Sequence, residues 1–312
     1  MDNKQIIIYG AGKRGEACYE FIKARGKENI VYAFCDRNYN EISQIDGKRV
    51  ISFEEARDCK MPFLISVVEA AEEIKSMITK VGCDWINLEE LSLILGEDRV
   101  KINHDFCSFF HIEGMDDYFE SAENESSIIV FWQKDTPFYQ EFVKLDLENV
   151  IELACGRGRH VPHYIMNAGH ITLVDILQKN IDMCKDRFKD EDKISYYCNN
   201  GFNLEELPSD TYSALFCYDA MVHFEMMDIY EYLKDIFRVL KSGGLALIHH
   251  SNNSNDYKAS FTNSNYGRSF MSETLFAYLA YRCGFTICSQ KTIDWGVKNL
   301  DCISLIMKPC NI

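Results

Sequence analysis

The sequence predicts an α/β protein with two Rossmann-like domains, because a buried strand leads into a glycine-rich loop and then a helix at two separate places. The first place is residues 5–15 and the second is residues 150–158. Each opening of this kind begins a parallel sheet of its own. We therefore expect a small domain at residues 1–100 and a larger domain, which begins with connector helices, at residues 101–312.

Strands and helices alternate along the first domain, as expected for a sheet that is covered by helices. Its length indicates that the second half of a full dinucleotide-binding domain is absent. The expected elements are a helix at 13–25, strands at 30–35, 50–52 and 63–67, a helix at 70–81 and a strand at 84–87.

The second domain alternates in the same way but closes with two successive strands, which is unusual for an ordinary dinucleotide-binding fold. Residues 91–146 are rich in aromatic and acidic side chains and predict a connector with helices that cover this domain. The expected elements are strands at 150–153, 171–174, 194–198, 214–218 and 244–249, helices at 161–166, 179–188, 228–240 and 272–283, and closing strands at 285–290 and 301–308.

The composition excludes several classes of protein. The net charge of −15 repels phosphate backbones, so we expect no nucleic-acid partner. No apolar run approaches the ~20 residues of a membrane helix, and no signal-peptide pattern opens the chain. The 13 cysteines are scattered without a C-x-x-C pair, which predicts free thiols in a reducing cytoplasm, with neither disulfides nor a metal site.

The second glycine loop carries the sharpest functional signal. A carboxylate, two glycines, a strand-end aspartate and a strand-end asparagine lie at the carboxyl ends of successive predicted strands, where an open α/β sheet binds its ligand. Small residues let a ligand approach the backbone, the aspartate can accept hydrogen bonds from both ribose hydroxyls, and the asparagine can bond the edge of a purine. The candidate cofactor-binding residues are Glu152, Ala154, Gly156, Gly158, Asp175, Ile176, Asn200, Gly201 and Phe202.

With these motifs, residues 132–308 resemble the class I S-adenosylmethionine-dependent methyltransferases. The resemblance implies a sheet with an antiparallel final strand and S-adenosylmethionine as the cofactor. It further implies that the methionine part lies beside Gly156 and Gly158, the ribose on Asp175, and the adenine near Asn200 and Phe202. Many members carry aspartate in place of Asn200, although an asparagine carbonyl can still accept a hydrogen bond from adenine. The motifs that carry the resemblance are Glu152–Gly158, Leu173–Asp175, Asn199–Gly201, Cys217–Phe224 and Leu240–Gly244.

Three histidines and one aspartate near the ends of the fourth and fifth strands are the candidates for catalysis. A histidine with a pKa near neutrality can take the proton from a hydroxyl group as a methyl group moves to its oxygen. His223 follows the fourth strand, whereas His249 and His250 end the fifth, where only one of the two can face a substrate. Asp219 could orient the base or contact the cofactor's amino group. The polar segment 251–268, with interleaved aromatic residues, predicts a lid or wall suited to a sugar.

The first glycine loop satisfies G-x-G-x-x-G through Gly10, Gly12 and Gly15, and Asp36 ends the next strand. This spacing is typical of nicotinamide dinucleotide binding. Residues 4–91 also resemble the small N-terminal domain of bacterial sugar-modifying acetyltransferases, which implies a nucleotide or nucleotide-sugar ligand. A scaffold without a ligand is the third interpretation. The residues that carry this second resemblance are 8–15, Asp36 and 45–52.

Together these features predict a cytoplasmic S-adenosylmethionine-dependent O-methyltransferase that acts on a small polar acceptor, a sugar or nucleotide-linked sugar of polysaccharide or natural-product biosynthesis. The expected partner is the sugar-like substrate, with no membrane and no nucleic acid, and a homo-oligomer is left open. Two alternatives are an NAD-dependent oxidoreductase that uses the first glycine loop and a nucleotide-sensing or scaffold protein that is not an enzyme. Val161 stands where a dinucleotide-binding loop carries glycine or alanine, which argues against NAD at the second loop.

Overall fold

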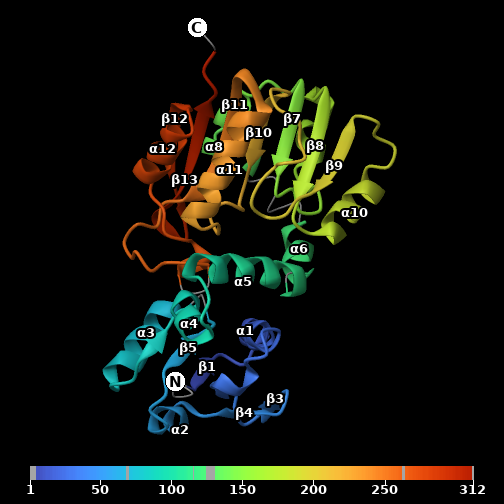
Figure 1. Ribbon diagram of the computed structural model, residues 1–312. Helices are drawn as coiled ribbons and strands as arrows, with labels where there is room; N and C mark the ends of the chain where they lie inside the picture. Colours follow the sequence, from blue (N-terminus) through green and yellow to red (C-terminus); the bar gives the residue numbers. More distant parts are fainter. Residues whose placement is uncertain (1–4, 68–69, 115, 124–130, 262–263, 311–312) are drawn as a thin grey trace. The chain divides into compact units, whose positions relative to one another are not determined.

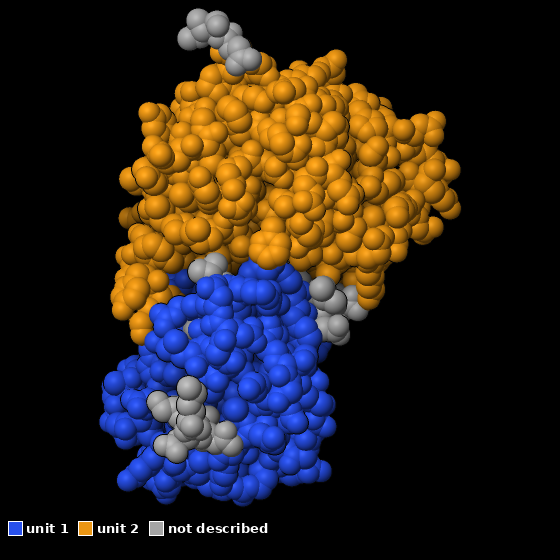
Figure 2. All heavy atoms as spheres, in the orientation of Figure 1, with its two compact units in different colours: residues 1–115, 259–268 blue, residues 116–258, 269–312 orange. Residues whose placement is uncertain are grey.

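The computed structural model describes residues 5–67, 70–114, 116–123, 131–261 and 264–310, and the chain divides into two compact units. Unit 1 is residues 1–115 and 259–268, and unit 2 is residues 116–258 and 269–312 (Figure 2). We expected a boundary at 100/101. Instead, unit 1 extends to residue 115 and also takes in a short segment from the sequence of the second domain.

Unit 1 is built on a six-stranded sheet with the order β3-β4-β2-β1-β5-β6. All neighbouring strands are parallel except β3 and β4. Because strands lie on both sides of β1, the second half that we expected to be absent is present in a short form. The strand order reverses between β1 and β5, which is where open α/β sheets bind ligands. In chain order the elements are β1 (Ile6–Tyr9), α1 (Lys13–Lys23), β2 (Val31–Cys35), β3 (Gln44–Ile45), β4 (Lys48–Ile51), α2 (Phe53–Asp58), β5 (Phe63–Ile65), α3 (Ala71–Lys80), β6 (Trp85–Ile86), α4 (Leu88–Leu95) and α5 (Arg99–Gly114), with short 3-10 turns at Glu28–Ile30 and Asn265–Gly267 (Figure 1).

The two faces of the unit 1 sheet form two cores, because successive strand side chains point in opposite directions. Ile6 and Ile8 pack with α1, α4 and α5, whereas Ile7 packs with α2 and α3. Phe261, which comes from the segment 259–268, is only 3% exposed and belongs to the first core. The guanidinium of Arg14 lies 4.3 Å from the centre of the Phe261 ring. This segment is therefore an integral part of unit 1.

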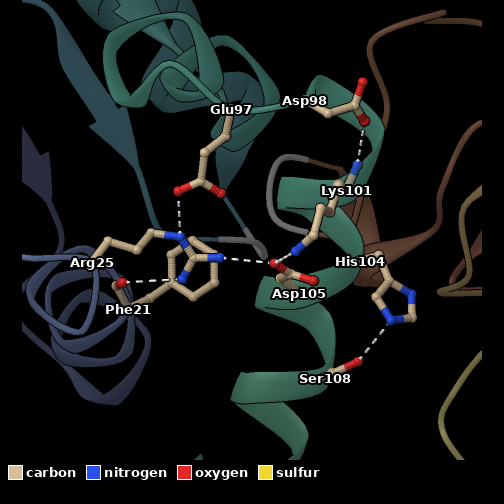
Figure 3. Close-up of polar contacts among 8 residues, drawn as sticks. All are labelled: Phe21, Arg25, Glu97, Asp98, Lys101, His104, Asp105 and Ser108. Carbon is tan, nitrogen blue, oxygen red and sulfur yellow. Dashed lines mark hydrogen bonds and ion pairs between the residues drawn. The ribbon is translucent and has the colours of Figure 1, made fainter.

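An arginine fastens α5 to α1 within unit 1 (Figure 3). Arg25 donates to Glu97 and to Asp105, both at 2.9 Å, and its guanidinium lies 3.6 Å from the centre of the Phe21 ring. Lys101 pairs with the same Asp105 carboxylate. Arg25, Glu97 and Asp105 are only partly exposed, so their bonds stabilise the packing of α5 more than isolated surface ion pairs would, whereas Lys101 is exposed.

Unit 2 contains a seven-stranded sheet with the order β12-β13-β11-β10-β7-β8-β9. The strands from β9 to β11 are parallel, and β13 is antiparallel to both of its neighbours. The prediction of a second α/β sheet with an antiparallel final strand is thereby confirmed. In chain order the elements are α6 (Asp116–Ala122), α8 (Pro137–Phe142), β7 (Asn149–Leu153), α9 (Val161–Tyr164), a 3-10 turn (Ile165–Asn167), β8 (His170–Asp175), α10 (Gln178–Arg187), β9 (Ile194–Cys198), β10 (Tyr212–Cys217), α11 (Met226–Val239), β11 (Leu240–Ser251), α12 (Glu273–Arg282), β12 (Thr286–Trp295) and β13 (Val297–Met307) (Figure 1).

Helices cover both faces of the unit 2 sheet. The helices α11 and α12 lie over one face of this sheet (Figure 1). Their side chains pack with Leu215 and Cys217 of β10. Side chains of α8, α9 and α10 pack on the other face with Ala214 and Phe216 of the same strand. Unit 2 thus forms three layers, and the carboxyl ends of its strands β7, β8, β9, β10 and β11 share one edge of the sheet.

Some features are absent from the part of the chain that the structure describes. None of its helices is both long and apolar enough to cross a membrane. Within the same residues, no three histidine, cysteine or acidic side chains gather in a way that could hold a metal ion. All 13 cysteines are free thiols.

Candidate functional site

The loop between β7 and α9 turns sharply at the carboxyl edge of the unit 2 sheet. Ala154, Gly156 and Gly158 have positive φ angles of 58°, 55° and 76°, a conformation that favours glycine and strains alanine. A Cβ atom at Gly158 would lie 2.5 Å from Cε2 of Phe188, and one at Gly156 would lie 3.2 Å from Phe119. The backbone conformation therefore favours glycine at both positions, and the Phe188 ring also leaves no room for a Cβ atom at Gly158.

Asp175, at the end of β8, fastens this loop. Its carboxylate accepts hydrogen bonds from the Gly156 backbone N–H at 2.8 Å, the Leu177 backbone N–H at 2.9 Å and the Asn180 side-chain amide at 3.1 Å. Burial raises the pKa of Asp175 to about 6, against the opposing effect of these donors. The aspartate that we expected to hold a ribose thus also holds the shape of the glycine loop.

Glu152 lies in β7, two residues before the loop begins to turn, and is 2% exposed. The Tyr164 hydroxyl donates to its Oε2 at 2.6 Å, whereas Oε1 has no hydrogen-bond partner within the described residues. Burial raises the pKa of Glu152 to about 8, although the hydrogen bond from Tyr164 lowers it. A buried carboxyl oxygen without a partner indicates a place for a ligand.

The loop after β9 holds itself in place through Asn200. The Asn200 carbonyl oxygen accepts from the backbone N–H groups of Phe202 and Asn203, at 2.9 and 3.1 Å. Gly201 has a φ of 85°, and Phe202 is 37% exposed at this edge of the sheet. The half-buried Ile176 follows β8 beside this loop. Asn200 therefore shapes the loop that presents the Phe202 ring.

Asp219, which follows β10, gathers two partners that the sequence analysis did not identify. The Tyr118 hydroxyl donates to its carboxylate at 3.3 Å, and an Arg159 guanidinium nitrogen lies 3.6 Å away. Desolvation and the negative charge of Asp219 raise the pKa of Tyr118 to about 12. Arg159 adjoins the glycine loop in sequence, but no sequence pattern connects Tyr118 with a residue 101 positions later.

Two of the three candidate histidines do not fit the role of a base. His249 donates from Nε2 to Asp301 at 3.0 Å and accepts at Nδ1 from the Asp219 backbone N–H at 3.1 Å. His250 bonds the Ser251 carbonyl through Nδ1 and Ser304 Oγ through Nε2, both at 2.8 Å, and burial lowers its pKa to about 3. Both rings are buried and use both nitrogens, so each serves the structure of the sheet.

His223 differs from these two because it is only half-buried, in the turn that follows β10. Its backbone N–H donates to Ala220 at 3.0 Å, and its carbonyl accepts from Ser269 Oγ at 2.8 Å. The Ser269 backbone N–H also donates to Val222 at 3.1 Å. These bonds hold the backbone of the turn in which both Asp219 and His223 follow β10.

The glycine loop of unit 1 follows the same plan. Asp36 accepts from the Ala11 backbone N–H at 2.8 Å, as Asp175 does from Gly156. A Cβ atom at Gly15 would lie 2.0 Å from the Gly10 carbonyl oxygen, whereas one at Gly12 would meet no atom within 4 Å. The packing of unit 1 therefore requires Gly15, and the open space at Gly12 leaves the backbone accessible to a ligand.

Comparison with protein families gives different results for the two units. Residues 150–244 match the model of a family described as "Methyltransferase domain". Residues 2–86 match a model described as "C2185-like, N-terminal", and not one of acetyltransferases. No curated protein matches the chain.

Two solved structures each align with part of this chain. The PH0226 protein from Pyrococcus horikoshii OT3 aligns with a TM-score of 0.50 at 16% identity, over 62% of this chain and 100% of that chain. An S-adenosylmethionine-dependent methyltransferase from Clostridium acetobutylicum ATCC 824 aligns with a TM-score of 0.45 at 13% identity, over 60% and 99% of the two chains. At these identities the likeness shows the fold alone.

Proposed function

We propose that this chain, an S-adenosylmethionine-dependent methyltransferase, transfers a methyl group to a hydroxyl oxygen of a sugar or nucleotide-linked sugar. The observation that carries the proposal is the edge of the unit 2 sheet. The candidate residues lie at the carboxyl ends of four neighbouring strands of this sheet. They are the glycine loop after β7, Asp175 at the end of β8, the Phe202 loop after β9, and Asp219 and His223 after β10. A cofactor site and a general base at one edge are what methyl transfer to a hydroxyl group requires.

The residues at this edge fit the cofactor. Oε1 of Glu152 offers a buried acceptor without a partner in the described residues, and the positive φ angles of Gly156 and Gly158 open the backbone of the loop. We assign the ribose to Asp175, the amino-acid part to the loop from Ala154 to Gly158, and the adenine to the stretch formed by Asn200, Gly201 and Phe202, with Ile176 beside it. When bound, the cofactor supplies an electrophilic methyl group on a positively charged sulfur.

His223 is the proposed general base. The hydrogen bonds from Ser269 to the His223 and Val222 carbonyls hold the backbone of the turn that carries it. A neutral histidine accepts the proton that the acceptor hydroxyl loses as its oxygen bonds to carbon. Asp219 lies in the same turn, and we assign it to orienting the acceptor or the cofactor's amino group.

Two features support a sugar as the acceptor. The segment that follows β11 presents exposed polar residues, Ser254 and Asn255, and Tyr257, which is 79% exposed. Amides and hydroxyls suit sugar hydroxyls, and an aromatic ring suits a sugar's C–H face. In addition, the open backbone at Gly12 of unit 1 suits the phosphates of a nucleotide.

We accordingly propose that Gly10, Gly12, Gly15 and Asp36 form a second nucleotide site within unit 1, whose ligand is a nucleotide or nucleotide-sugar. The alternative occupant is NAD, whose ribose hydroxyls would need Asp36. That carboxylate accepts from the backbone N–H groups of Ala11 and Asn38, both at 2.8 Å, in the same way as Asp175 accepts from its own loop in unit 2. A cytoplasmic location agrees with the 13 free thiols.

The test is transfer from S-adenosylmethionine with a ¹³C-labelled methyl group to a panel of uridine, thymidine and guanosine diphosphate hexoses. Nuclear magnetic resonance of the product distinguishes methyl on oxygen from methyl on nitrogen or carbon. We expect an O-methyl product with at least one sugar. A labelled product with methyl on nitrogen or carbon would refute the proposed chemistry.

A second experiment tests the base. Replacement of His223 by alanine should lower kcat by ~10²–10⁴ with little change in cofactor affinity. His170 is a matched control, because it begins β8 at the opposite edge of the sheet and bonds Ser195. The His170→Ala variant should keep the wild-type rate. Equal rates for wild type and His223→Ala would show that proximity alone carries the reaction.

A further inference from the structure

Glu152 differs from the other buried acids of unit 2 whose partners are known. Glu141 is also buried, but it pairs with Lys144 at 2.6 Å and Lys291 at 2.8 Å and accepts from Ser289 at 2.7 Å. Asp175 accepts from three N–H groups. Glu152 has a single donor, the Tyr164 hydroxyl, and Oε1 has no partner in the described residues.

An ionised carboxylate in that position would be expensive. A buried charge is tolerated when cations and hydrogen bonds compensate it, and a single hydroxyl does not suffice. A protonated carboxyl group is neutral and can still accept the hydrogen bond from Tyr164. The raised pKa of Glu152, about 8, agrees with this argument.

Some of the charged groups around Glu152 raise its pKa, and others lower it. The positive charges of Arg159 and Arg187 favour ionisation of Glu152, and the carboxylate of Asp175 opposes it. The Cys155 and Cys217 thiols have pKa values that burial raises, so they remain neutral near pH 7. Tyr164 likewise remains neutral, because burial and Glu152 raise its pKa.

We propose that Glu152 is protonated in the cofactor-free enzyme and releases its proton to solvent when S-adenosylmethionine binds, so that the site distinguishes the positively charged cofactor from the neutral sulfur of the product, S-adenosylhomocysteine. A nearby cation favours the ionised carboxylate, and a ligand with more positive charge favours it more strongly. Binding the cofactor and losing the proton therefore assist each other. After methyl transfer the sulfur is neutral, and Glu152 regains a proton as the product leaves.

Isothermal titration calorimetry of the full chain tests this without any acceptor. The number of protons released on binding follows from titrations at pH 7.0 in buffers of different ionisation enthalpy. We expect the wild-type protein to release more protons with S-adenosylmethionine than with S-adenosylhomocysteine. Its affinity for S-adenosylmethionine should rise by up to about tenfold per pH unit between pH 6.5 and 7.5.

The Glu152→Gln variant isolates the contribution of this residue, because glutamine imitates the neutral acid and can still accept from Tyr164. It should release fewer protons with S-adenosylmethionine and show a flatter pH dependence. The cofactor's own α-amino group, with a pKa of about 8, titrates in both proteins and cancels in the comparison. Thermal unfolding checks that the variant is folded. If it is not, Tyr164→Phe serves, and its pH dependence should move upward.

The matched control is Glu141→Gln, which removes a buried acid whose pKa is lowered to about 2 and which is therefore already ionised. It should leave the proton count unchanged. Equal proton release by wild type and Glu152→Gln, with both proteins binding the cofactor, would overturn the proposal and leave the methyl-transfer chemistry untouched. A wild-type protein that binds neither ligand would instead overturn the cofactor site itself.

Discussion

Replacement of Asp175 by asparagine should weaken S-adenosylmethionine binding through the glycine loop as well as through the ribose. Asparagine keeps one carbonyl oxygen, which can still accept from the Leu177 N–H and the Asn180 amide. The other oxygen becomes an NH₂ group that faces the Gly156 N–H, where Asp175 now accepts a hydrogen bond at 2.8 Å. Two donors then face each other, and the loop loses its attachment to β8.

The size of the effect follows from that lost hydrogen bond. A hydrogen bond to a charged group contributes about 1.5–3 kcal/mol. If the loop must be reordered each time the cofactor binds, this free energy is lost from binding. Because each 1.4 kcal/mol changes an equilibrium constant about tenfold, the dissociation constant should rise by about 10- to 100-fold.

The assay is calorimetric titration with S-adenosylmethionine at pH 7.5, above the pKa of Asp175, with circular dichroism to verify folding. Unit 1 supplies a matched control, since Asp36 holds the Ala11 N–H in the same geometry. The Asp36→Asn variant should keep the wild-type affinity. Unchanged affinity in a folded Asp175→Asn protein, or an equal loss in both variants, would refute the reasoning.

Three further predictions concern stability. Glu141→Gln should cost about 3 kcal/mol at pH 7 in urea unfolding, because a buried charge network is broken. Hydrogen bonds lower the native pKa of Glu141 to about 2, below its ordinary value of 4.5, so the difference from wild type should persist above pH 4.5 and vanish as pH falls toward 2. Gly15→Ala should unfold unit 1, because its Cβ atom would overlap the Gly10 carbonyl oxygen. Gly12→Ala should keep the wild-type unfolding temperature, because its Cβ atom meets no other atom, but it should weaken nucleotide binding. Arg25→Met should destabilise the protein by about 1–2 kcal/mol, and Lys101→Met, at the exposed end of the same network, by less than about 1 kcal/mol.

Each of these has an outcome that contradicts it. A Glu141 variant whose stability deficit is the same at pH 7 and pH 3 would show that the loss comes from packing and not from charge. A well-folded Gly15→Ala protein would show that the loop can move to accommodate the new methyl group. Equal unfolding free energies for the Arg25 and Lys101 variants would show that Arg25 contributes no more than an exposed ion pair to the packing of α5.

The sequence by itself determined the two α/β units and the positions of both glycine loops. A buried strand followed by glycines and then by an amphipathic helix is a local pattern. It can be recognised from sequence because each of its features depends only on residues a few positions away. Gly156, Gly158 and Asp175 were identified in this way, and in the structure the Gly156 N–H donates to the Asp175 carboxylate at 2.8 Å. The same holds for the loop of unit 1 and Asp36.

Only the tertiary structure decided which histidines are available for chemistry. In sequence, His249 and His250 end a strand at the expected edge. The antiparallel pairing of β11 with β13 sets them against Ile303 and Cys302, and it thereby supplies Asp301 and Ser304 as partners from more than 50 residues away. Such contacts depend on strand register, which no local pattern encodes.

The membership of the segment 259–268 was likewise decided by packing. Its polar composition predicts a lid. In the structure, however, the Phe261 side chain packs in the core of unit 1, beside Arg14. Tyr118 reaches Asp219 across 101 positions of sequence in the same way. Local periodicity specifies which side of an element is apolar, but only the completed fold specifies which distant surface covers it, because burial is a property of the assembled molecule.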